Sequence, residues 1–285
     1  MSFLDAIVEN TRRRVAERRA KLPLVELHAR TRDAPPVRSF HGALARGFSV
    51  IAEHKRRSPS GGASDPKNVA GAYDVYTEIP WISAVSVLTD EDYFAGSIDD
   101  LAQARERVKK PVLRKDFIVD EYQVVEARAF GADAVLLMAS VLAGEKDRMR
   151  ALYELSRSLD LDVLVELGMT ERRIEDLVQV VPAEARIWGI NARQFKKTGG
   201  VGDHSHDPRA RHELPTDVQA HQDYRRLVPP SKLAVAESGI HSAEELRAAR
   251  AAGYDAALIG TAFLRGPKSV ADVAHELGRA FADPA

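Results

Sequence analysis

The chain of 285 residues has no cysteine and no long hydrophobic run. The missing thiols exclude disulfides, thiolate metal sites and a cysteine nucleophile, and they are compatible with a reducing cytoplasm. No apolar run approaches the roughly 18 residues of a membrane span, and the first residues lack the apolar core of a signal peptide. We therefore expect a cytoplasmic protein that has no membrane partner.

An excess of charge of either sign is also missing, because 41 Lys and Arg residues balance 42 Asp and Glu residues. No overall field then attracts nucleic acid or an anionic membrane, so an anionic ligand must be held by local groups. The arginine run that begins at Arg12 belongs to a helical pattern, and it fits a solvated helix face better than an anion site.

What the chain does contain is a series of eight short apolar runs that end abruptly at charged, amide or glycine residues. They occupy residues 48–55, 82–88, 111–116, 134–138, 163–166, 187–191, 233–238 and 256–260, and helical patterns separate most of them. This alternation predicts an α/β protein, a (β/α)8 TIM barrel with its active site at the carboxyl ends of the strands. We expect residues 46–285 to form the barrel and residues 1–45 to form an N-terminal helical extension that packs on it.

The segment of residues 196–230 interrupts the alternation. It is long, polar and rich in Gly, His, Asp and Pro, with helical character only near residues 218–227, and we interpret most of it as a mobile insertion. Its His and Asp residues do not predict a metal site, because alternating residues in a flexible loop rarely hold a fixed coordination geometry. They are Asp203, His204, His206, Asp207, His212 and His221.

Two charged residues close the first apolar run. Glu53 and Lys55 are two apart in the sequence, so their side chains share one face of a strand, and in the barrel interior they would form a carboxylate and ammonium pair at the mouth. An ordinary ion pair on a loop is the alternative. Ser58 and Pro59 follow in a tight turn that offers hydroxyls and backbone amides.

Three later runs end at groups suited to proton transfer and anion binding. Lys115 would lie in a desolvated mouth near other cations, where the pKa of a lysine falls far enough to allow proton donation. Glu166 is a candidate base, and Asn191 with Arg193 suits the orientation of a carbonyl and the binding of a carboxylate. The alternatives are an exposed lysine and a carboxylate that is solvated or paired with Lys115.

The last two runs end in residues typical of phosphate loops. Barrels frequently bind phosphate after the seventh and eighth strands, because glycine amides there present unpaired N–H groups to the anion. The alternative is that the glycines only permit tight turns. The residues concerned are Glu237, Ser238, Gly239, Gly260 and Thr261.

With these residues in place, the chain strongly resembles the indole-3-glycerol phosphate synthase family. The matching segments are FLDAIVENTRRRVAERRAKLPL, VIAEHKRRSPSGG, SVLTDEDYFAGSIDDL, PVLRKDFIVDEYQVVEARAFGADAVLLM, LVELG, GINAR, VAESGI and DAALIGTAFLR. The resemblance implies conversion of 1-(o-carboxyphenylamino)-1-deoxyribulose 5-phosphate to indole-3-glycerol phosphate, with release of carbon dioxide and water and without a cofactor or metal.

The resemblance also implies catalytic roles. The general acid of the family falls on Lys115, and its second catalytic lysine falls on Lys55, with Glu53 beside it. Glu166 matches the base in the loss of water, and Asn191 matches the partner that positions it.

Binding roles follow from the same resemblance. Ser58, next to Pro59, and Arg193 would hold the anthranilate carboxylate, and Phe117 and Leu137 would wall the aromatic ring. The phosphate would lie on residues after the last two strands, namely Gly239, Gly260 and Thr261, with Glu237 and Ser238 in support. The expected partner is a phosphorylated small molecule, and we expect a monomer or a weak homodimer.

Some features depart from the family. The loop after the first strand is shorter, and Ala192 replaces an asparagine in the usual NNR pattern. No departure removes a catalytic position. Two alternatives stay open, a different phosphosugar barrel such as phosphoribosylanthranilate isomerase and a non-catalytic binding protein. The pair of Lys55 and Lys115 argues against the isomerase, and the intact catalytic set argues against the binding protein.

Overall fold

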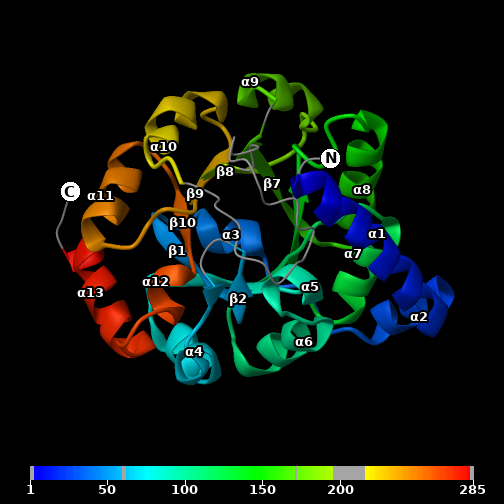
Figure 1. Cartoon of the computed structure of the whole chain (residues 1–285), viewed down its shortest axis with the longest axis horizontal. Helices are drawn as coiled ribbons and strands as arrows, with labels where there is room; N and C mark the ends of the chain where they lie inside the picture. The colour runs from blue at the N-terminus through cyan, green and yellow to red at the C-terminus, as the bar shows by residue number, and fades with distance from the viewer. Residues whose placement is uncertain (1–2, 60–61, 171, 195–215, 283–285) are drawn as a thin grey trace, which may run out of the picture.

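A closed barrel of eight parallel strands forms the centre of the computed structural model, which describes residues 3–59, 62–170, 172–194 and 216–282 (Figure 1). The order around the barrel is β1-β10-β9-β8-β7-β6-β5-β4, and β1 closes it by pairing with both β10 and β4. The predicted (β/α)8 barrel is confirmed. Its strands are β1 (Ser49–His54), β4 (Ile82–Leu88), β5 (Val112–Lys115), β6 (Ala134–Met138), β7 (Asp162–Met169), β8 (Ile187–Gln194), β9 (Leu233–Glu237) and β10 (Ala256–Ile259).

Helices surround the strands, and several begin at capping side chains. Asp65 accepts a hydrogen bond from the backbone of Lys67, with Pro66 in the first helical turn, and Ser242 and Glu245 form a capping box. The outer helices are α4 (Pro66–Glu78), α6 (Ile98–Arg107), α7 (Glu121–Ala129), α8 (Lys146–Ser158), α9 (Ile174–Leu177), α10 (Gln219–Tyr224), α11 (Ala243–Ala251), α12 (Thr261–Leu264) and α13 (Val270–Ala282). Shorter elements are the hairpin β2 (Arg57–Ser58) and β3 (Gly62–Ala63), helix α5 (Glu91–Phe94), and the 3-10 turns η1 (Val178–Val180) and η2 (Arg225–Leu227).

Strand side chains alternate between two separate hydrophobic layers. Residues such as Val135 and Leu137 point outward and pack with the helices, whereas Leu113, Leu136 and Leu164 fill the barrel interior. All five are buried. Because the interior below the rim is filled with apolar side chains, polar groups can collect only at the upper layer.

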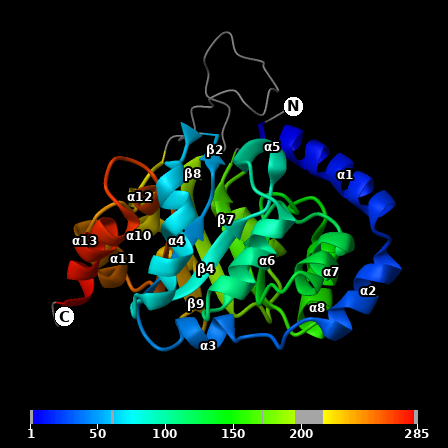
Figure 2. The same cartoon turned by 90° about the horizontal axis from the view of Figure 1, so that it is seen from below.

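Helix α3 (Phe40–Leu44) closes the lower end of the barrel, as Figure 2 shows. Phe40 and Leu44 are fully buried in the interior layer. The backbone N–H of His41 donates to Asp162 Oδ2 at 2.9 Å, at the start of β7. Access to the interior is therefore from the carboxyl ends of the strands.

Helices α1 (Phe3–Lys21) and α2 (Leu24–Asp33) precede the barrel. The arginine run of α1 does more than face solvent, because its side chains pair with acids on the barrel helices. Arg14 lies 2.6 Å from Asp92 of α5, and Arg18 lies 3.1 Å from Glu126 of α7. These contacts attach α1 beside the rim.

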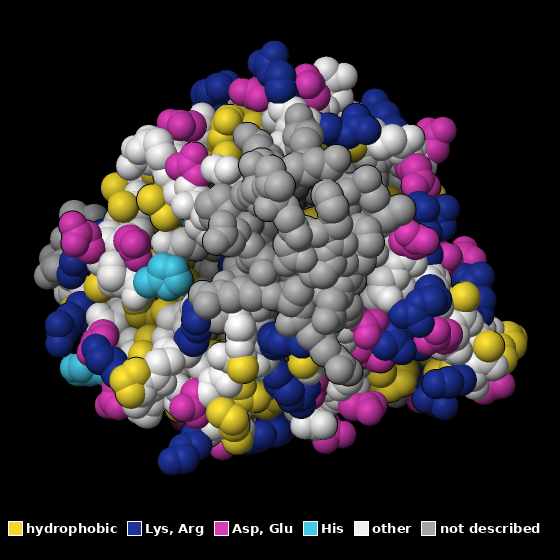
Figure 3. Space-filling model, viewed as in Figure 1, with side chains coloured by type: hydrophobic (Ala, Val, Ile, Leu, Met, Phe, Trp, Pro, Cys, Tyr) yellow, Lys and Arg dark blue, Asp and Glu magenta, His cyan; other side chains and the backbone are white. Residues whose placement is uncertain are grey.

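The surface carries no large field of one sign on the face seen in Figure 3, where basic and acidic side chains are interspersed. Among the described residues, none of the helices combines the length and the apolar character needed to cross a membrane. Of the expected insertion, residues 196–215 lie outside the described part of the chain, and α10 with η2 occupies the stretch where helical character was predicted.

Replacing Phe40 by alanine should test the importance of the lower closure. The lost burial and the resulting cavity should reduce the free energy of unfolding by about 3–5 kcal/mol, measured by urea denaturation. Val25→Ala on α2 is the control, because this side chain is 75% exposed, and it should change stability by less than about 0.5 kcal/mol. Similar losses in the two variants would contradict the role given to Phe40.

Candidate active site

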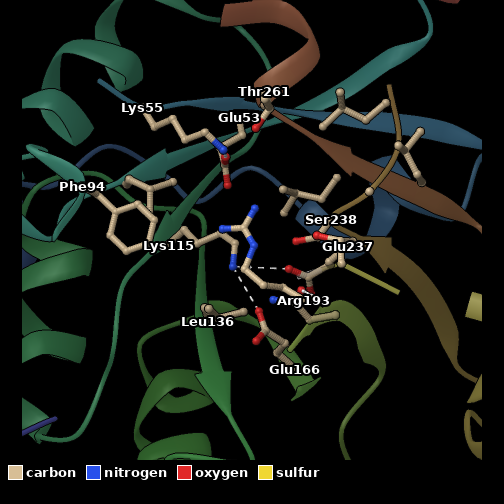
Figure 4. Close-up of a pocket in the computed structure, with 18 of the residues that line it drawn as sticks. Glu53, Lys55, Phe94, Lys115, Leu136, Glu166, Arg193, Glu237, Ser238 and Thr261 are labelled. Atoms are coloured by element: carbon tan, nitrogen blue, oxygen red, sulfur yellow. Dashed lines mark hydrogen bonds and ion pairs between the residues drawn. The ribbon is translucent and has the colours of Figure 1, made fainter. Parts of the chain in front are cut away.

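A cavity opens at the carboxyl ends of the strands, with a volume of about 800 Å³ that includes its open mouth (Figure 4). Most of the residues predicted from the sequence line it together, although they come from six different strands or the loops after them. These are Glu53, Lys55, Lys115, Phe117, Glu166, Asn191, Arg193, Glu237, Ser238, Gly239, Gly260 and Thr261.

The predicted pair at the end of β1 is present and faces the cavity. Lys55 Nζ lies 2.5 Å from Glu53 Oε1, and both side chains are buried. Burial would raise the pKa of Glu53, but the charges of Lys55, Lys115 and Arg193 lower it overall. Burial lowers the pKa of Lys55, and Arg193 and Lys115 lower it further, against the opposing charge of Glu53.

Lys115 contacts two carboxyl groups. Its Nζ atom is 3.0 Å from Glu166 Oε2 and 3.3 Å from Glu237 Oε2, the contacts drawn in Figure 4. Burial would lower the pKa of Lys115, but Glu166, Glu237 and Glu53 together raise it. The predicted lowering at Lys115 is therefore wrong, because the carboxylates around it outweigh burial and the nearby cations. The lowered lysine pKa occurs at Lys55 instead.

Glu237 is the carboxyl group in this cavity whose environment disfavours its charged form. Its burial and the neighbouring charge of Glu166 raise its pKa to about 8, although Lys115 opposes the shift. Glu166 and Glu237 are two buried carboxyl groups that contact the same ammonium, so one positive charge cannot fully compensate two negative charges. Glu166 Oε1 and Glu237 Oε1 are buried and have no hydrogen-bond partner among the described residues, whereas Glu237 Oε2 forms the ion pair with Lys115.

The end of β8 supplies an amide and a guanidinium. The backbone N–H of Arg193 donates to Asn191 Oδ1 at 3.0 Å, which fixes the orientation of the amide. Burial lowers the pKa of Arg193, while Glu53 and Glu166 act in the opposite direction. Arg193 also forms a β-bridge with Thr216, a cavity residue that sequence analysis did not find.

The turn after β9 has an unusual backbone. Ser238 and Gly239 both have positive φ, at 68° and 80°. A Cβ atom on Gly239 would lie 2.7 Å from Thr216 Cγ2, so a larger residue would be strained by its backbone and by its neighbour. Gly260 and Thr261 follow β10, the neighbouring strand, at the start of α12.

Three predicted binding residues do not line the cavity. The structure corrects Leu137, whose side chain packs in the outer layer with the helices. Side chains alternate along β6, so Leu136 and Met138 face the cavity instead. Ser58 and Pro59 are buried in and beside β2, outside the cavity lining.

An aromatic wall of the cavity was only half predicted. The ring of Phe94, in α5, lies 6.2 Å from that of Phe117, measured between centroids, and both residues line the cavity. Strand-end patterns do not reveal Phe94, because it lies in a short helix inside a loop. Leu136 could have been found from the sequence, because side chains alternate between the two faces of β6.

The His and Asp residues of the insertion fall mostly outside the described residues. His221 is described and is buried, with Nε2 lying 3.1 Å from the backbone oxygen of Glu237. Among the described residues, no group of three or more His, Asp or Glu side chains is arranged to hold a metal ion. The described role of His221 is its contact with the end of β9.

Two lysines and several carboxylates that share one buried cavity at the strand ends define an acid–base enzyme of the (β/α)8-barrel class. A family model described as indole-3-glycerol phosphate synthase matches residues 4–199. The chain belongs to the indole-3-glycerol phosphate synthase family.

Similar proteins extend this match to nearly the full length. The indole-3-glycerol phosphate synthase of Rhodopirellula baltica is 38% identical over 273 residues, covering 94% of this chain and 95% of that protein. The Streptomyces griseus protein of the same name is 38% identical and covers 100% of this chain and 98% of its own length. A solved orotidine 5'-phosphate decarboxylase from Pyrococcus horikoshii has a TM-score of 0.56 at 13% identity, covering 82% of this chain and 100% of that one. That likeness concerns the fold alone.

Glu237→Gln should change how stability depends on pH. A carboxyl group whose pKa rises from 4.5 when unfolded to about 8 when folded holds its proton only in the folded chain within that window. Its contribution to stability is therefore complete at low pH and is lost as the pH rises toward 8. The variant should show a smaller fall in melting temperature between pH 5 and pH 8, measured by thermal denaturation.

Glu244→Gln is the matched control, because Glu244 is exposed on α11. It should follow the pH dependence of the unchanged protein. Identical pH dependence in the Glu237→Gln variant would contradict the raised pKa.

Proposed function

We propose that the cavity converts 1-(o-carboxyphenylamino)-1-deoxyribulose 5-phosphate to indole-3-glycerol phosphate in tryptophan biosynthesis. The reaction closes a ring, releases carbon dioxide and then releases water. The observation that carries this proposal is the Lys115 ammonium, which contacts Glu166 and Glu237 in the same cavity as Lys55 and Glu53. This arrangement supplies fixed positive charge, a proton donor and a base around one small ligand.

Ring closure places negative charge on the former ketone oxygen as the aromatic carbon attacks the ketone carbon. Lys115 remains charged because carboxylates raise its pKa, and its N–H groups can hydrogen-bond to the developing oxyanion and protonate it. A fixed ammonium in a buried site stabilises such charge better than water, because it needs no reorganisation during the reaction. Loss of carbon dioxide then returns the bonding electrons to the ring and restores its aromaticity.

Loss of water needs one acid and one base. The hydroxyl group formed in ring closure leaves with a proton, and a proton is removed from the new five-membered ring. Glu166 fits the base, since its Oε1 atom has no hydrogen-bond partner among the described residues. Lys55 fits a proton donor, because burial lowers its pKa. Each step needs only proton transfer and charge stabilisation, so we propose that no cofactor or metal takes part.

Two anionic groups on the substrate match two parts of the cavity. Arg193 lies on one side and suits the anthranilate carboxylate. Gly239, Gly260 and Thr261 lie after the neighbouring strands β9 and β10 and suit the phosphate. Binding the carboxylate and the phosphate at the two ends of the substrate holds the reacting atoms between them in a fixed orientation.

The proposal also includes the expected partners, oligomeric state and location of the protein. Interspersed surface charge and a net charge of −1 support a small-molecule partner and no nucleic acid. Among the described residues, the large hydrophobic side chains that are exposed are Val25 and Val218, which supports a monomer or a weak homodimer. The family and the lack of cysteine support a cytoplasmic location.

The direct test is to incubate the purified protein with the carboxyphenylamino-deoxyribulose phosphate and to follow indole absorbance and fluorescence. We expect indole-3-glycerol phosphate and one equivalent of carbon dioxide. The absence of product at high enzyme concentration would reject the proposal and favour a binding protein.

Lys115→Ala should lower kcat at least about a hundredfold while leaving KM nearly unchanged, because its charge acts mainly on the transition state. Steady-state kinetics measure both values. Lys109→Ala removes an exposed lysine close by in the sequence and should leave both constants unchanged. A kcat near normal in Lys115→Ala would remove Lys115 from the acid role.

A further inference from the structure

Gly189 leaves a space on the inner face of β8 that the carboxylate of Glu237 fills. Its neighbours Trp188 and Ile190 belong to the outer layer, so the Gly189 position faces the interior. A Cβ atom built on Gly189 would lie 2.0 Å from Glu237 Oε1 and 3.1 Å from Glu237 Cδ. Contacts below 3.0 Å essentially never occur for real Cβ atoms. Any side chain at this position therefore displaces the carboxylate.

The displaced group would be one of the two carboxyl groups that contact Lys115. Glu237 belongs to β9, which pairs with β8, and its side chain reaches the space at Gly189 on that neighbouring strand. In this position its Oε2 atom lies 3.3 Å from Lys115 Nζ, and Figure 4 shows Glu237 and Glu166 on the same side of the ammonium. The space at Gly189 therefore sets how closely Glu237 approaches Lys115.

The same arrangement occurs a second time in the barrel. A Cβ atom on Gly260 would lie 2.3 Å from Glu53 Oε1 and 2.9 Å from Glu53 Cβ. Glu53 belongs to β1, and Gly260 directly follows β10, the strand paired with β1. Each of these buried carboxylates thus occupies space left by a glycine on, or directly after, the neighbouring strand.

We propose that Gly189 is a positioning residue of the active site, because its missing side chain holds open the space in which the Glu237 carboxylate contacts Lys115. The role given to this contact in catalysis rests on the proposed function, whereas the packing relation between Gly189 and Glu237 does not. Gly260 relates to Glu53 in the same way. Its substitution would also meet Glu53 Cβ, so Gly189 offers the cleaner test.

The backbone at position 189 and the neighbouring side chains other than Glu237 should accommodate alanine. Gly189 does not have a positive φ, so its backbone suits an L-amino acid. The nearest atom outside Glu237 is Leu164 Cδ1 at 3.4 Å from the built Cβ, an ordinary contact. In a strand, alanine is otherwise more favourable than glycine, because glycine loses more conformational freedom on folding.

The experiment is a double-mutant cycle on the full chain with Gly189→Ala, Glu237→Ala and the double variant. Melting temperature is measured for all four proteins, and kcat and KM are measured wherever turnover is detectable. Gly189→Ala alone should lower the melting temperature and reduce kcat about ten- to a hundredfold, with KM within about threefold of normal, since a small displacement of an active-site group costs this much. In the Glu237→Ala background the same change should not lower the melting temperature, because the clashing carboxylate is gone.

Gly71→Ala is the matched control. Gly71 lies in α4, has no positive φ, and a Cβ atom there meets nothing within 4 Å. This change should leave kcat and KM as they are and should leave the melting temperature equal or slightly higher.

Each outcome decides the proposal. An equal fall in melting temperature in both backgrounds, or a normal kcat in Gly189→Ala, would overturn it. If Gly189→Ala fails to fold, folding of the double variant supports the proposal and failure of the double variant rejects it. If the unchanged protein has no synthase activity, the proposed function fails, and the melting temperatures alone still decide whether Gly189 makes room for Glu237.

Discussion

The active site depends on one largely buried positive charge that contacts two carboxyl groups, the ammonium of Lys115. Burying it is costly unless carboxylates compensate, and Glu166 and Glu237 both contact it. Burial and the neighbouring charge of Glu166 raise the pKa of Glu237 to about 8. Lys55, Lys115 and Arg193 line the cavity together with the carboxyl groups of Glu53, Asp116, Glu166 and Glu237. The three cations suit a substrate with a carboxylate and a phosphate, in a chain whose net charge is only −1.

The barrel makes this cluster possible by confining where polar groups can lie. Apolar residues such as Leu113 and Leu164 fill the interior below the rim, and Phe40 closes its lower end. Strand alternation then brings the last inward-facing residue of each strand to the same level. Glycines at positions 189 and 260 leave the space that two of the carboxylates need. The charges meet at one mouth because the rest of the interior has no room for them.

Much of this arrangement could be predicted from the sequence, because the apolar runs stop at the residues that form the site. Errors arose where a property depends on spatial neighbours. Leu137 was assigned to the wrong face of β6, although alternation would have identified Leu136. The direction of the Lys115 pKa shift depends on Glu166 and Glu237, which come from other strands and approach only in the closed barrel. Phe94 lies in a loop helix with no strand pattern to reveal it.

The extension before the barrel is connected to the site through α5. Asp92 of α5 accepts a hydrogen bond from Asn10 at 2.6 Å and pairs with Arg14 of α1 at 2.6 Å. Asp90 caps the same short helix, accepting hydrogen bonds from the backbone of Tyr93 and Phe94. A four-residue helix has little stability of its own, so these contacts hold the ring of Phe94 against the cavity beside Phe117. Because α1 fixes α5 and α5 carries part of the aromatic wall, the described part of the extension contributes to the shape of the cavity without lining it.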